Sequence, residues 1–141
     1  MSTTTTRPLQ DAPIDVKLVL SALWIAMLFV FAYVDIFGFF RADVLEAALD
    51  GEVAATGLAV NQAFLIATLV YILLPALMVI LSLMLRPRLN RMLNLVVSVV
   101  YAVTIIASCI GESWVYYLLG SLIEVALLGT IALTAWRWPR A

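Results

Sequence analysis

The 141-residue sequence contains no histidine and a single cysteine, Cys109. Histidine is the usual protein ligand of haem and copper, so we expect neither group to be bound. One cysteine cannot form an internal disulfide or a Cys-x-x-Cys pair, which argues against thiol–disulfide chemistry. Glycine-rich phosphate loops and a serine nucleophile elbow are also missing. The sequence therefore predicts no enzyme activity, no catalytic residue, no metal and no cofactor.

Charged residues are scarce as well. They make up 12% of the chain, against 65% hydrophobic residues, whereas soluble domains average about 25% charged residues. The eight basic residues are too few for a nucleic-acid-binding surface. Four apolar runs dominate the sequence, at residues 18–40, 58–85, 92–110 and 114–136. As helices they are long enough to cross a hydrocarbon core, which takes about 20 residues. We therefore expect an all-α polytopic membrane protein, with residues 18–138 forming a four-transmembrane-helix bundle.

The distribution of basic residues predicts the topology. Seven of the eight lie before the first span, in the second connection or after the fourth span, and only Arg41 lies in the first connection. Cytoplasmic loops are enriched in lysine and arginine, so both termini are predicted to be cytoplasmic. The first run is too long for a cleaved signal peptide. Residues 1–17, with four consecutive threonines, are predicted to be a disordered cytoplasmic tail.

Two connecting features have local consequences. Residues 41–57 combine apolar residues at helical spacing with acidic ones, which suits either a short amphipathic surface helix or a solvated acidic loop. Pro75, inside the second span, removes a backbone hydrogen bond and predicts a kink whose freed carbonyl is satisfied by a neighbouring helix. Residues 86–91 are predicted to form the tight reversal between the second and third spans.

Each span carries one stripe of polar or small residues, which we expect to face the interior of the bundle and to join its helices. The stripes are Ser21, Trp24, Leu28, Asp35 and Gly38; Asn61, Thr68, Pro75 and Ser82; Asn94, Ser98, Tyr101, Thr104 and Ser108; and Tyr117, Gly120, Ser121 and Glu124.

Glu124 is the most informative of these residues. It lies roughly ten residues from either end of its span, near the membrane midplane, and no basic residue lies at matching depth. A carboxylate there costs at least a few kcal/mol, so we expect the neutral acid. The side chains at a depth to hydrogen-bond it are Thr68, Tyr71, Tyr101 and Thr104. Two interpretations stay open: a proton-exchanging or cation-binding group, or a neutral acid that joins helices.

Asp35 is shallower, about 7 Å inside the outer boundary of the membrane if the first span ends near Phe40. It is expected to anchor the interface by meeting water, Arg41 or the start of the second span. It also forms an outward-leading polar path with Glu124 if the faces of the two helices converge. Glu112, in the third connection, is expected to be exposed.

Four stretches carry a resemblance to known proteins: residues 17–24, 33–38, 89–94 and 111–124. Over them the chain resembles an uncharacterised family of small bacterial four-helix membrane proteins, distantly similar to the DoxX-like group. The resemblance implies a bundle in a bacterial inner membrane and transfers no active site. The chain is also similar in size to the small multidrug-resistance exporters. Their essential glutamate is in the first helix and their dual-topology members have weak charge bias, so an antiparallel dimer of that type is not expected.

Two functions follow from these observations. The first is a non-catalytic membrane subunit or assembly and interaction protein, favoured because four short helices leave little room for a gated pathway. Its partners would be the lipid bilayer, further copies of the chain or other membrane proteins. The alternative is a proton- or cation-coupled small transporter or channel, with Glu124 as the exchanging group and Asp35 near its outer mouth.

Overall fold

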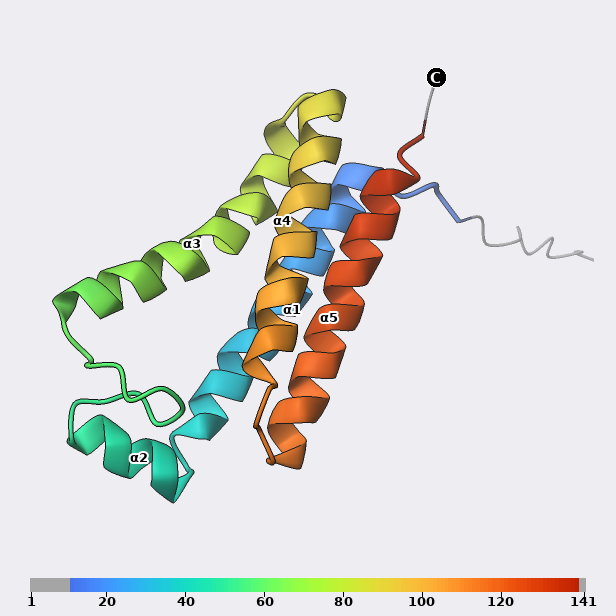
Figure 1. Ribbon diagram of the computed structural model, residues 1–141. Coiled ribbons are helices and arrows are strands. Elements are labelled where there is room, and N and C mark those ends of the chain that lie inside the picture. Colours follow the sequence, from blue (N-terminus) through green and yellow to red (C-terminus); the bar gives the residue numbers. More distant parts are fainter. Residues whose placement is uncertain (1–10, 140–141) are drawn as a thin grey trace, which may run out of the picture.

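The computed structural model describes residues 11–139 (Figure 1). It contains five helices: α1 (Val16–Gly38), α2 (Ala42–Leu49), α3 (Gln62–Met84), α4 (Pro87–Ser108) and α5 (Val115–Trp136). Four of them, α1, α3, α4 and α5, are long and apolar enough to cross a membrane. The described residues contain no β-strand beyond one isolated bridge between Glu52 and Ala59. The prediction of an all-α fold with four membrane-compatible helices is confirmed.

The start of α1 and of α3 is set by a capping side chain. Asp15 accepts a hydrogen bond of 2.7 Å from the backbone N–H of Lys17, so α1 begins two residues before the predicted span. Asn61 accepts one of 3.0 Å from the N–H of Phe64, and α3 therefore begins four residues later than predicted. The predicted tail, residues 1–17, falls mostly on residues 1–10, which lie outside the described part of the chain.

The turn predicted for residues 86–91 is wrong. α3 ends at Met84 and α4 already begins at Pro87, so only Leu85 and Arg86 separate the two helices. Proline suits the first position of a helix, where its missing N–H would have no partner in any case. The earlier start of α4 places Asn90 inside the helix, where it is fully buried.

The connection after α1 contains the helix α2, which supports the amphipathic-helix interpretation over the loop. No residue of α2 is buried. Beyond it, Gly51 and Gly57 adopt positive φ angles of 77° and 64°, which allow the chain to reverse twice before α3. Figure 1 shows α2 and this loop at one end of the bundle, called here the α2 end; the start of α1 and the end of α5 lie at the other, the termini end.

The helices do not pack equally. α5 packs along both α1 and α4, whereas α3 packs mainly against α1 and touches α4 only sparsely. The buried residues of α3 are Pro75, Met78 and Ser82, all in its second half. Towards its first turn α3 leans away from the other three helices (Figure 1). The apolar core consists of Leu20, Trp24, Met27, Met78, Val97, Tyr101, Ile105, Leu128 and Ile131.

Gly120 marks the closest approach of α1 and α5. A Cβ atom at this position would lie 2.3 Å from Cγ2 of Val34. One turn nearer the α2 end, a Cβ atom on Gly38 would lie 3.7 Å from the hydroxyl of Tyr116. Two helices that approach this closely bring the polar side chains beside the contact together as well.

Candidate functional site

A buried network of polar side chains joins α1, α3 and α4 near the termini end. Asn94 accepts hydrogen bonds through Oδ1 from Nε1 of Trp24 (2.7 Å) and from the hydroxyl of Ser82 (3.2 Å). Its Nδ2 donates to Oδ1 of Asn90 (2.6 Å), and Nδ2 of Asn90 donates to the backbone carbonyl of Ser82 (2.6 Å). We call these four residues the asparagine network.

The polar side chains of the asparagine network are buried and bond mainly to one another. Asn90, Asn94 and Ser82 are all 0% exposed, and their polar groups bond one another. Such a network stabilises one arrangement of the helices and leaves little capacity for a ligand. The sequence analysis identified Trp24, Ser82 and Asn94 but assigned Asn90 to a turn. Asn90 and Asn94 are four residues apart, a spacing that places them on one helix face once the helix begins at Pro87.

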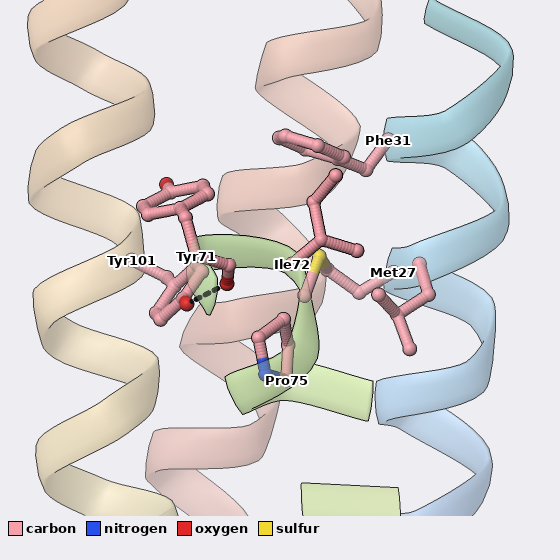
Figure 2. A pocket seen from close by; sticks show the side chains of 7 residues that line it. Met27, Phe31, Tyr71, Ile72, Pro75 and Tyr101 are labelled. Atoms are coloured by element: carbon pink, nitrogen blue, oxygen red, sulfur yellow. Dashed lines mark hydrogen bonds between the residues drawn. The ribbon is translucent and has the colours of Figure 1, made fainter. Parts of the chain in front are cut away.

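The carbonyl freed by Pro75 finds a donor on the neighbouring helix. Pro75 has no N–H, so the carbonyl of Tyr71, four residues earlier, has no donor within α3. The hydroxyl of Tyr101, on α4, donates to it. Figure 2 shows this bond one turn from the proline ring. The prediction that a neighbouring helix would satisfy the freed carbonyl is confirmed.

A small pocket lies beside Pro75, between α1, α3 and α4 (Figure 2). It has about 10 Å³ of free space, room for about one water molecule. Its lining is Met27, Leu28, Phe31, Tyr71, Ile72, Pro75 and Tyr101. The rings of Tyr71 and Tyr101 pack with centroids 4.7 Å apart, and those of Phe31 and Tyr71 are 6.3 Å apart. The pocket is a gap in the packing beside Pro75 and is too small for a substrate.

The hydroxyl groups predicted to surround Glu124 bond elsewhere. The hydroxyl of Tyr71 bonds that of Thr104 (2.6 Å), and Thr104 also donates to the carbonyl of Tyr101 (2.9 Å). The hydroxyl of Thr68 donates within its own helix, to the carbonyl of Phe64 (2.9 Å). The structure thus brings Tyr71, Tyr101 and Thr104 together with one another. Thr68 stays apart from this group.

Glu124 is enclosed on α5. The residue is 2% exposed, and it shares the buried face of the helix with Gly120, Ser121 and Leu128. Its Oε1 atom is inaccessible to solvent and has no hydrogen-bond partner among residues 11–139. Among residues 11–139 the hydroxyl of Tyr116 is also buried without a partner. Glu124 differs from it in being an ionisable carboxyl with unused bonding capacity.

Asp35 and Glu124 flank the contact between α1 and α5, because Asp35 follows Val34 on α1 and Glu124 lies one turn from Gly120 on α5. The Val34–Gly120 contact holds the two helices together between these two positions. Asp35 itself is exposed. The hydroxyl of Tyr117, on the same helix as Glu124, donates a hydrogen bond of 3.0 Å to the hydroxyl of Ser108. The faces of the two helices therefore converge, and Asp35 and Glu124 are called here the carboxyl pair.

Arg41 forms a separate cluster at the α2 end. Its guanidinium bonds Asp43 (2.6 Å) and Glu112 (2.9 Å) and lies 4.7 Å from the centre of the Trp114 ring. The prediction that Glu112 is simply exposed is wrong, since its side chain is only 17% accessible. Arg41 does not pair with Asp35 as the sequence analysis allowed, because these two other carboxylates hold its guanidinium.

The electrostatics of this cluster favour the charged forms. Hydrogen bonds to Asp43, and less strongly to Glu112, raise the pKa of Arg41 despite its burial. Burial by itself would raise the pKa of Glu112, but the hydrogen bonds from Arg41 and from the N–H groups of Trp114 and Ser113 outweigh it and lower the pKa. The cluster is an ion-paired clamp that ties the end of α1 to the connection between α4 and α5.

The other residue types with potential chemistry do not gather. Among residues 11–139 there is no group of three His, Cys, Asp or Glu side chains that could hold a metal ion. Cys109, at the end of α4, is half-buried and free.

The fold and this site define a class: a small polytopic helical bundle with four membrane-compatible helices and a carboxyl pair between two of them. Over residues 13–140 the sequence matches DUF6326, a family of unknown function, and the chain belongs to that family. No curated protein and no solved structure matches the chain. The match agrees with the resemblance to an uncharacterised family, whereas the likeness to the DoxX-like group and the bacterial origin stay predictions.

Proposed function

We propose that this protein is a small proton- or cation-coupled membrane transporter or channel whose exchanging group is the carboxyl pair. The observation that carries the proposal is the unpartnered Oε1 atom of Glu124, in a residue that is 2% exposed. A glutamic acid that serves only to join helices would be expected to bond a neighbouring helix. The side chains best placed by depth, those of Tyr71, Tyr101 and Thr104, bond elsewhere.

The surroundings of the pair suit the exchange of one positive charge. Two carboxylates that flank one helix contact, with no base between them, disfavour simultaneous ionisation, so a proton or a cation would accompany one of them. The basic side chains of the four long helices lie near helix ends, at Lys17, Arg88 and Arg91, and none lies at the level of Glu124. Asp35 is exposed and Glu124 is enclosed, so the charge would enter from the α2 end through Asp35.

The test is proton flux into liposomes that contain the purified protein and an internal pH-sensitive dye, driven by a potassium diffusion potential. Glu124→Gln preserves the shape of the side chain and removes the exchangeable proton, and it should reduce the flux to that of empty liposomes. Glu46→Gln, an exposed carboxyl on α2, is the matched control and should leave the flux unchanged. Equal flux from wild type and Glu124→Gln would sink the proposal, as would wild-type flux no greater than that of empty liposomes.

Infrared spectroscopy tests the protonation of the same pair independently. Infrared carboxyl absorption, recorded across pH for wild type and Glu124→Gln, should contain one band that titrates and is missing in the variant. A Glu124 band that stays constant at every pH would identify a structural acid without proton access.

The second candidate is the non-catalytic subunit or interaction protein, and the position of α3 favours it. The first half of α3 is not covered by the other helices, and Leu65, Leu69 and Val70 are 57–63% exposed. In this candidate a transmembrane helix of a second copy packs there.

Crosslinking would test this packing. In a Cys109→Ser background, Leu69→Cys (63% exposed) should crosslink two copies in the membrane through a short bismaleimide. Leu122→Cys, on α5 and 65% exposed, is a control of equal accessibility. Equal crosslinking at both positions, or none at Leu69→Cys, would contradict the interaction.

We also propose that the protein lies in the plasma membrane with both termini on the cytoplasmic side. It is supported by the basic residues at the termini end, Lys17, Arg88 and Arg91, against the acidic side chains of α2. Protease protection of tags at either terminus, in right-side-out and inverted vesicles, measures it.

A further inference from the structure

An open groove lies at the termini end, between the first turns of α4 and the end of α5. Its volume is about 930 Å³, within the range of small-molecule sites. Its lining consists of Pro87, Arg88, Arg91, Met92, Leu95, Trp136, Trp138 and Pro139. It is separate from the carboxyl pair, which lies nearer the α2 end.

The charge of the groove comes from Arg88 and Arg91, three residues apart and therefore on neighbouring positions of one helix face. Among residues 11–139 the ion pairs are those of Arg41 at the far end of the molecule, so neither arginine is neutralised by a described carboxylate. The guanidinium of Arg91 lies 5.6 Å from the centre of the Trp136 ring, so a cation–π contact joins the two sides of the groove.

The remaining lining is apolar and aromatic, and it has a direction. Arg88 lies in the first turn of α4, and Met92 and Leu95 follow one and two turns further into the membrane-compatible helix. Trp136 and Trp138 close the opposite side where α5 ends. Tryptophan is enriched at the level of lipid headgroups. The groove thus changes from cationic to apolar along the direction in which a phospholipid changes from headgroup to acyl chain.

We propose that this groove is a binding site for an anionic phospholipid, with the headgroup phosphate against Arg88 and Arg91 and the start of an acyl chain against Met92 and Leu95. A soluble anion would use the arginines but not the apolar wall, and an apolar peptide would leave both arginines without a counter-charge. Only an amphiphile with a negative headgroup satisfies the two parts of the groove together. The site does not depend on the transport activity proposed above.

Lipid retention measures the binding. The purified protein is incubated in detergent with equimolar phosphatidylglycerol and phosphatidylcholine, and native mass spectrometry counts the lipids that stay bound. Wild type should retain phosphatidylglycerol preferentially. Arg88→Gln and Arg91→Gln should each weaken its retention by about fivefold, the effect of one arginine at an anionic membrane surface. Arg137→Gln removes an exposed charge at the same end but outside the groove, and it should retain the lipid like wild type.

Two measurements on wild type test the site without depending on the folding of a variant. For wild type alone, retention of phosphatidylglycerol should fall as sodium chloride is raised during incubation, because salt screens the arginines. Inorganic phosphate at matched ionic strength should displace no more lipid than chloride does. Equal retention of the two lipids, no dependence on salt, selective displacement by phosphate, or an equal loss in Arg137→Gln would each overturn the assignment.

Discussion

Replacing Gly120 by alanine tests the helix contact that positions the carboxyl pair. The added Cβ atom would lie 2.3 Å from Cγ2, 3.6 Å from Cβ and 3.8 Å from Cγ1 of Val34. Ordinary contacts between carbon atoms are about 3.5–4.0 Å, so the first distance is more than 1 Å too short. Because Val34 is β-branched and stiff at χ1, we expect α1 and α5 to move apart locally.

The magnitude follows from two opposing effects. Overpacking of this kind costs about 1–3 kcal/mol, and replacing glycine by alanine in a helix interior gains about 1 kcal/mol. Gly120→Ala should therefore lower the free energy of unfolding by up to about 2 kcal/mol. Gly129 lies on the same helix, and a Cβ atom there meets nothing within 4 Å. Gly129→Ala carries only the favourable effect and should be neutral or slightly stabilising.

The assay is reversible unfolding of the purified protein in mixed micelles with increasing dodecyl sulfate, followed by far-ultraviolet circular dichroism. Val34→Ala removes the clashing methyl group, so the double variant Gly120→Ala/Val34→Ala should be more stable than the sum of the single changes predicts. α1 and α5 do not meet as described if Gly120→Ala and Gly129→Ala unfold at the same fraction of dodecyl sulfate. The same conclusion follows if the double-mutant cycle of Gly120→Ala and Val34→Ala shows no coupling energy.

Three further changes probe other parts of the bundle, each by the same unfolding measurement or a thermal melt in detergent. Asn94→Ala should cost at least about 2 kcal/mol, because it leaves several buried polar groups of the asparagine network unpaired; a loss as small as that of an exposed substitution would refute the network. Tyr101→Phe should cost about 1 kcal/mol in wild type, and much less in a Pro75→Ala background, where the new N–H can bond the freed carbonyl of α3; equal costs would contradict that role. The pKa of Glu112 lies below its ordinary value of 4.5, so its ion pair with Arg41 stabilises the fold above that pH and is lost as the pH falls through the lowered pKa. The melting temperature of wild type should therefore fall more steeply below pH 4.5 than that of Glu112→Gln. Parallel curves for the two proteins would show that the ion pair does not contribute to stability.

The hydrophobic pattern was sufficient for the class and order of the helices because lipid imposes a length and a polarity on every span. The effect of Pro75 is also predictable from the sequence, because its missing N–H leaves one carbonyl of the helix without a donor wherever the helix is placed. The start of α4 was misjudged because Arg88, Asn90 and Arg91 look like a polar turn in sequence. Pro87 at the first helical position, and the burial of Asn90 against Ser82, made those residues helical instead.

What the sequence by itself determined was therefore local: four apolar helices, a proline bend, one carboxyl at mid-depth without a nearby base, and two arginines beside the end of a span. The tertiary structure decided which of these groups meet. Hydroxyls at the depth of Glu124 bond one another or a backbone carbonyl, while Gly120 lets α1 approach α5 so that Asp35 and Glu124 flank one contact. Depth along a helix follows from residue number, but the rotation of a helix and the distance to its neighbour depend on side-chain packing. Those two quantities decide whether a buried carboxyl joins helices or stays available for a proton or a cation.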